Sequence, residues 1–143
     1  MEARNPDYRK FIEAGFAKAP FVSANAITLD DCGPGWCASQ VILEPHHLQQ
    51  FGIAHGGLIA TLADHTAGGA AATLIEAGSA TMTAELKVSM LRPAKGTRLE
   101  CRAEVLKAGR AISFVEAEVY AVEGERRDLV AKASATMAVI VGK

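Results

Sequence analysis

The stretch GLIATLADHTAGGAAATLIEA, residues 57–77, decides the architecture of this chain of 143 residues. Its apolar residues occupy most sides of a helix rather than a single stripe, and a helix of that kind is buried on most sides. Gly68 and Gly69 interrupt it although glycine is a poor helix former, which predicts close packing at that point. We therefore expect a long central helix over 57–77, ended by Glu76 and Gly78.

The sequence after this helix alternates between apolar and polar residues with a period of two, four times over. Such alternation is typical of antiparallel strands with one covered face and one polar face. The connections at 93–96, 107–110 and 123–128 are too short for the crossovers that parallel strands need. The predicted strands lie at 82–90, 99–105, 115–121 and 131–139.

The sequence before the helix predicts a hairpin and a short helix. Strand candidates at 26–29 and 36–43 are separated by the turn residues Gly33-Pro34-Gly35. An N-terminal helical segment over 1–20 begins near Asn5 and ends at Pro20. The predicted fold class is therefore α+β: one domain over 1–143, in which a six-stranded antiparallel sheet covers one long helix.

Composition narrows the function classes. With 15 basic and 16 acidic residues, the chain lacks the basic excess of a nucleic-acid-binding protein. No apolar run is long enough to cross a membrane. Three cysteines without a CxxC pair predict reduced, buried thiols in a cytoplasmic protein. The four histidines lack the spacing of metal ligands, so we expect no metal and no other cofactor.

Asp64 is the residue that a purely structural helix does not explain. A carboxylate in the most apolar segment of the chain is costly unless it is paired, so it is either a satisfied buried group or a functional one. His55, Gly56 and Gly57 stand just ahead of the helix. The glycines let a ligand approach the backbone, and the free N–H groups of a first helical turn bind anions or a developing oxyanion.

Helix geometry limits how these groups act together. Asp64 follows Gly57 by seven residues, so both point the same way but lie about 10 Å apart along the axis. One substrate carbon cannot contact both groups of the same chain. If both act on one substrate, Asp64 comes from a second subunit, in a symmetric dimer with two shared sites. His55 is half a turn out of phase with Asp64, which disfavours a His–Asp dyad.

The residues Gly52-Ile53-Ala54-His55-Gly56-Gly57, followed by Leu62-Ala63-Asp64, resemble the G-x-x-H-G-G…L-x-D signature of the PaaI-like hotdog acyl-CoA thioesterases. The segment TAELKVSMLRP, residues 83–93, is similar to that family's strand after the helix. The resemblance covers roughly residues 20–141. It implies a hotdog fold, a long helix wrapped by a six-stranded antiparallel sheet, assembled as a homodimer or homotetramer.

The resemblance also implies roles for individual residues. Asp64 is the base or nucleophile, and the Gly57 N–H polarises the thioester carbonyl opposite the Asp64 of a facing subunit. His55 shapes the loop, and the Thr83 hydroxyl helps to hold water or the carboxylate. Gln49 stands where the family usually has asparagine, so its amide is one methylene further out.

The implied reaction is hydrolysis of an acyl- or aryl-CoA thioester to the free acid and CoA. Gly56 allows close approach of the substrate, and Arg92, Lys95 and Arg110 are candidates for holding the phosphates of CoA or, alternatively, solvated loop charges. Two other functions stay open: a non-catalytic acyl-CoA binding module, and a hotdog hydratase or dehydratase of acyl thioesters. The second needs a histidine beside the acid, and the helix offers only Asp64.

Overall fold

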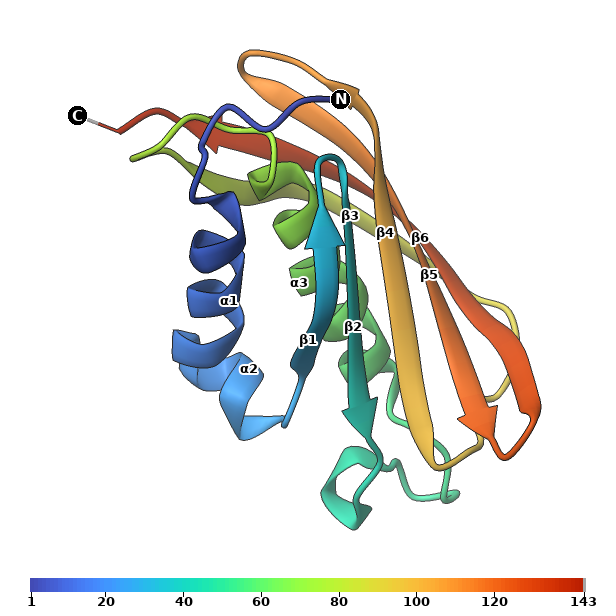
Figure 1. Ribbon diagram of the computed structural model, residues 1–143. Coiled ribbons are helices and arrows are strands. Elements are labelled where there is room, and N and C mark those ends of the chain that lie inside the picture. Colours follow the sequence, from blue (N-terminus) through green and yellow to red (C-terminus); the bar gives the residue numbers. More distant parts are fainter. Residues whose placement is uncertain (143) are drawn as a thin grey trace.

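The computed structural model describes residues 1–142, in which a six-stranded antiparallel sheet packs against a long helix, α3 (Gly56–Ala72). The strand order across the sheet is β1-β2-β4-β5-β6-β3. Helix α3 contacts all six strands and lies along the face of the sheet that curves round it (Figure 1). The strands are β1 (Thr28–Gly33), β2 (Trp36–Ile42), β3 (Ala80–Met90), β4 (Arg98–Ala108), β5 (Ile112–Glu123) and β6 (Arg126–Ile140). The predicted fold class is confirmed.

Small side chains on the covered face of the sheet let α3 approach closely. Alanine is the smallest side chain that still packs, so it shortens the distance between helix and sheet without leaving voids. Larger buried residues such as Leu62, Leu99 and Met137 fill the space between them. The buried alanines of β4, β5 and β6 are Ala103, Ala117, Ala121, Ala131, Ala133 and Ala135.

The two adjacent glycines of α3 have different surroundings. A Cβ at Gly69 would lie 3.0 Å from Cys37 Sγ, so this glycine is required by close packing against β2, as predicted. A Cβ at Gly68 would meet nothing closer than Thr81 Oγ1 at 3.9 Å. The prediction of close packing therefore holds for Gly69 and is wrong for Gly68.

Two short helices, not one, make up the N-terminal segment. Helix α1 (Tyr8–Lys18) buries Ile12 and Phe16, and helix α2 (Pro20–Ala24) follows after one residue. Pro20 therefore ends the first helix, as predicted, but it also begins a second one, because proline suits the first helical position. Figure 1 shows α1 beside α3, on the side away from β4, β5 and β6.

The remaining differences from prediction concern element ends. Helix α3 stops at Ala72 rather than at residue 77. The hydroxyl of Thr73, which follows it, donates to the Ala70 carbonyl and accepts from Gly35 N–H. Leu74 and Ile75 stay buried in the following turn, so the apolar pattern outlasts the helix. Strand β1 covers Thr28–Gly33 instead of 26–29, since a bulge and two aspartates interrupt its alternation.

Strand β3 forms one edge of the sheet and pairs only with β6 among the described residues. It is 11 residues long and exposed along most of both faces, with Met82 62% exposed. A long exposed edge of this kind presents unpaired backbone groups to a further strand.

The two glycines give opposite predictions for stability. Gly68→Ala should stabilise the fold by up to about 1 kcal/mol, because alanine is the better helix former and its Cβ meets no clash. Gly69→Ala should destabilise it by about 1–3 kcal/mol through overpacking against Cys37. Urea unfolding of both variants measures this. Equal stability of the two would contradict the packing described here.

Candidate active site

Asp64 is held in place by a hydrogen bond from the neighbouring sheet. It sits in the middle of α3 and is half-buried. The Thr83 hydroxyl of β3 donates to Asp64 Oδ1 at 2.6 Å. A hydrogen bond to an ionised group fixes its orientation and is stronger than one between neutral partners. The structure thus brings together two residues that lie 19 positions apart in the sequence and that were both predicted as site residues.

A local irregularity in β3 aims Thr83 at the helix. Thr83 pairs with Met137 of β6, and the register then shifts before Glu85 pairs with Thr136. A bulge of this kind redirects a side chain and bends its strand. Thr83 therefore shares the inner side of the sheet with the buried Met137, where α3 lies.

The start of α3 differs by one residue from the prediction, and this changes which backbone amide is free. The helix begins at Gly56, so His55 is its N-cap. The His55 Nδ1 atom accepts the Gly57 N–H at 2.8 Å. The backbone carbonyl of His55 accepts the N–H groups of Leu58 and Ile59. Within residues 1–142 the Gly56 N–H has no acceptor. The Gly57 N–H, predicted as the oxyanion donor, is therefore already engaged, and the Gly56 N–H is available.

The loop before the helix holds Gln49 in a tight turn. The Gln49 side-chain oxygen accepts the Phe51 N–H, and its backbone bonds to Ile53 and Gly52 close the loop. Phe51 itself is 80% exposed. Gln49 stands seven residues before the start of α3 in the sequence. In the part of the chain described, no hydrogen bond links its side-chain amide to Asp64.

Asp64 and the free amide of the same chain cannot meet on one small group. Gly56 and Asp64 are eight residues apart on a continuous helix, which separates them by about 12 Å along its axis. Asp64 instead lines a cavity of about 410 Å³ between α1, α3 and β3. The Asp64 carboxylate therefore has mostly apolar neighbours. A substrate atom that it contacts is out of hydrogen-bonding range of the Gly56 N–H of the same chain.

The predicted cationic residues fall at two ends of the molecule. Arg92 and Lys95 lie in the loop between β3 and β4, which bonds to Ala54 just ahead of α3. Arg110 lies in the hairpin between β4 and β5, in a pocket with Leu74 and Ile75 beyond the other end of α3. Arg92 and Lys95 therefore share one loop, and the β4–β5 hairpin that carries Arg110 lies at the opposite end of β4 (Figure 1).

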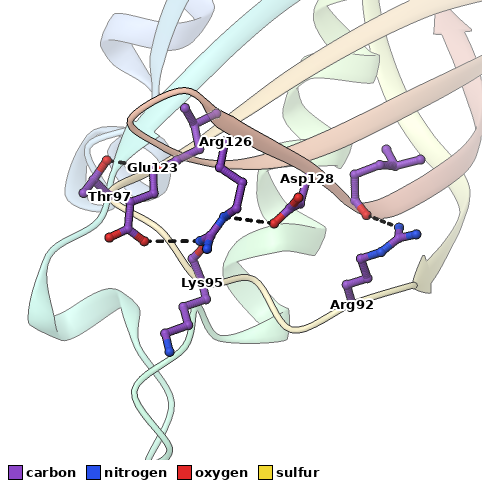
Figure 2. Close-up of polar contacts among 8 residues, drawn as sticks. Arg92, Lys95, Thr97, Glu123, Arg126 and Asp128 are labelled. Carbon is purple, nitrogen blue, oxygen red and sulfur yellow. Dashed lines mark hydrogen bonds and ion pairs between the residues drawn. The ribbon is translucent and has the colours of Figure 1, made fainter.

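Figure 2 shows how the loop with Arg92 and Lys95 is anchored. The Arg92 guanidinium donates to the Leu129 carbonyl at 2.8 Å. Arg126, which the sequence interpretation missed, lies between Glu123 and Asp128 and donates to the Lys95 carbonyl at 3.0 Å. The Lys95 side chain extends away from this cluster. Only the fold could identify this role of Arg126, because the Lys95 carbonyl belongs to a different loop.

The remaining titratable groups near the core are unsuited to chemistry. All three cysteines are buried and free, as predicted. Burial raises the pKa of the Cys101 thiol to about 12 and raises that of Cys37 further, so both stay protonated. Burial also lowers the pKa of His65, which favours its neutral form. Residues 1–142 contain no cluster of His, Cys, Asp or Glu that could hold a metal.

Comparisons with known proteins agree with this fold. The family model of the thioesterase superfamily matches residues 51–127, which include the start of α3, Asp64 and Thr83. The chain belongs to the thioesterase superfamily. Human acyl-coenzyme A thioesterase 13 is 31% identical over 94 residues, which span 65% of this chain and 66%, just under two thirds, of the human protein.

Solved structures of thioesterases share the whole fold. A thioesterase family protein from Silicibacter pomeroyi is 32% identical, with a TM-score of 0.92 over 94% of this chain and 99% of its own. A thioesterase from Haemophilus influenzae has a TM-score of 0.85 over 99% of this chain and 96% of its own, at 21% identity. No helix within residues 1–142 is long and apolar enough to span a membrane.

The hydrogen bond from Thr83 to Asp64 gives a direct prediction. Thr83→Val keeps the shape of the side chain but removes the hydroxyl, so the turnover of a thioester should fall about ten- to hundredfold, the range expected for a bond to an ionised group. Thr83→Ser should keep most of the activity. Initial rates of thiol release measure both variants. A Thr83→Val variant as active as Thr83→Ser would show that the bond has no catalytic role.

Proposed function

We propose that this protein is an acyl-CoA thioesterase in which Asp64 provides the catalytic carboxylate. The observation that supports this most directly is the carboxylate in the middle of the buried helix, oriented by Thr83 and open to a cavity. Membership of the thioesterase superfamily and the similarity to human acyl-coenzyme A thioesterase 13 support the same reaction. The substrate is a CoA thioester, and the products are the free acid and CoA.

In the proposed reaction, Asp64 either takes a proton from an attacking water or attacks the thioester carbon itself. In both routes the carbon–sulfur bond breaks, CoA leaves as a thiolate that takes up a proton, and water supplies the new oxygen of the acid. Negative charge develops on the carbonyl oxygen during the attack. The Gly56 N–H, at the positive end of the helix dipole of α3, is the donor that we assign to that oxygen, in place of Gly57.

The separation between Asp64 and Gly56 supports a site shared by two chains. Because about 12 Å of helix lies between them, a thioester beside one chain's Asp64 needs the Gly56 of another chain. The long exposed edge of β3 offers the surface for such a pair, because two copies can continue the sheet across a twofold axis. Thr83 lies on this edge strand, so the pairing would place Asp64 near the partner.

The phosphates of CoA are assigned to the loop that carries Arg92 and Lys95. The loop bonds to Ala54 and so lies beside the helix start that would hold the thioester carbonyl. Arg126 fixes its backbone, while the Lys95 side chain extends away (Figure 2). Arg92 and Lys95 are exposed cations, and such groups at the rim of a site are suited to phosphates. Arg110 is not assigned to this cluster, because it lies at the other end of α3.

Asp64→Asn should lower thiol release from acyl-CoA by about 10²–10⁴-fold, because asparagine keeps the shape and can accept the Thr83 bond but cannot act as a base. The assay compares the wild type and this variant on acetyl-, octanoyl-, palmitoyl- and phenylacetyl-CoA. A circular dichroism melt serves as the fold control. An Asp64→Asn variant with wild-type turnover would exclude the proposed carboxylate, and a wild type inactive on every substrate would favour a binding role.

Gly56→Pro tests the assigned oxyanion donor. Proline removes the N–H while suiting the first position of a helix, and the extended backbone of His55 (φ −63°, ψ 137°) is compatible with a following proline. We expect turnover to fall by about 10²–10³-fold. Gly56→Ala is the control, since it keeps the N–H and its Cβ would meet only the flexible end of Met90. Equal rates for the two variants would move the donor elsewhere.

A further inference from the structure

The cavity beside Asp64 has walls from both ends of the chain. Helix α1 supplies Phe11, Ile12 and Phe16, and helix α3 forms the opposite side. The cavity holds about 410 Å³, within the range of small-ligand pockets. Asp64 is the only charged residue among those that line it. The remaining wall is mostly apolar, so the cavity suits an apolar group attached to something that reacts at Asp64.

The polar residues of the cavity wall are already satisfied. Thr81 Oγ1 donates to the Gly68 carbonyl at 3.2 Å, and Thr83 is engaged by Asp64. The His65 ring packs edge-on against Phe16, with 4.4 Å between ring centroids, and burial favours its neutral form. These residues therefore present little unmet hydrogen-bonding capacity to a ligand, which again favours an apolar one.

Two helical glycines, one on α3 and one on α1, line this cavity at positions where a side chain meets no clash. Gly68 lies one turn beyond Asp64 on α3, and a Cβ there would make ordinary van der Waals contact with Thr81 Oγ1 at 3.9 Å, without a clash. Gly15 lies on α1, and a Cβ there would meet nothing within 4 Å. Neither position has a positive φ that would require glycine. Alanine would suit both helices better, so the folded chain alone does not explain these glycines.

We infer that this cavity is the acyl pocket, that it takes a medium-length aliphatic chain, and that Gly68 and Gly15 determine its length. This inference rests on the proposed thioesterase function. The chain would run from Asp64 past Gly68 to Ala72, which is eight residues or about 12 Å along α3. An octanoyl or decanoyl chain fits that span, whereas a palmitoyl chain exceeds it. Helix α1 is then part of the substrate site, with Phe11 and Phe16 as its apolar wall.

The test is the chain-length profile of kcat/KM on acetyl-, octanoyl-, decanoyl- and palmitoyl-CoA. The wild type should prefer octanoyl- or decanoyl-CoA. Gly68→Leu should lower the ratio of decanoyl to acetyl activity by about 100-fold or more. Several methylenes of the acyl chain lose their place, and each one changes kcat/KM by about tenfold or more. Gly15→Leu should shift the profile the same way from the opposite wall. It provides a second test if Gly68→Leu fails to fold.

Ala17→Leu is the matched control, because Ala17 lies two residues after Gly15 on α1, is exposed, and does not line the cavity. It should keep the wild-type profile. A decanoyl-to-acetyl ratio that both glycine variants leave unchanged would overturn the inference while leaving the thioesterase proposal intact. So would a wild type that rejects octanoyl- and decanoyl-CoA but hydrolyses other thioesters. No thiol release from any acyl-CoA would overturn the proposed function itself, and the inference with it.

Discussion

A helix that is apolar on nearly every side has to be covered on nearly every side, and this constraint shapes the whole molecule. Six strands contact α3, and the alanines of β4, β5 and β6 let them come close to it. Helix α1 covers part of what the sheet leaves open, with Phe16 and Ile12 buried beneath it. Gly69 marks a close contact, against Cys37 of β2. The cavity beside Asp64 is the space that this covering leaves unfilled.

Two polar features of α3 bear on the proposed chemistry, and each has an identified partner. Asp64 is tied to β3 through Thr83, and the helix start is capped by His55. Because a helix is rigid, these two features stay about 12 Å apart within one chain. The proposed chemistry therefore needs an arrangement that a single chain does not complete. The exposed edge of β3 is the surface that could complete it.

Much of this was predictable because the patterns are local. Alternation identified β3 to β6, and the apolar helix with one carboxylate identified Asp64. Thr83 came from the resemblance to a family, and the structure places it on Asp64. The details that differ from the expectation depend on one residue or on tertiary partners. Because His55 caps the helix, the free backbone amide is that of Gly56 and not that of Gly57. Gly68 and Gly69 are adjacent in the sequence, which does not show that only Gly69 packs closely against a neighbouring strand.

The most direct test of the shared site is complementation between Asp64→Asn and Gly56→Pro, each inactive alone. The two are unfolded, mixed in equal amounts and refolded together. About half of the resulting dimers are mixed, and each mixed dimer has one site with both groups intact, so the mixture should regain about one quarter of the wild-type activity. A mixture no more active than the sum of the two separate variants would contradict a site built from Asp64 of one chain and Gly56 of another.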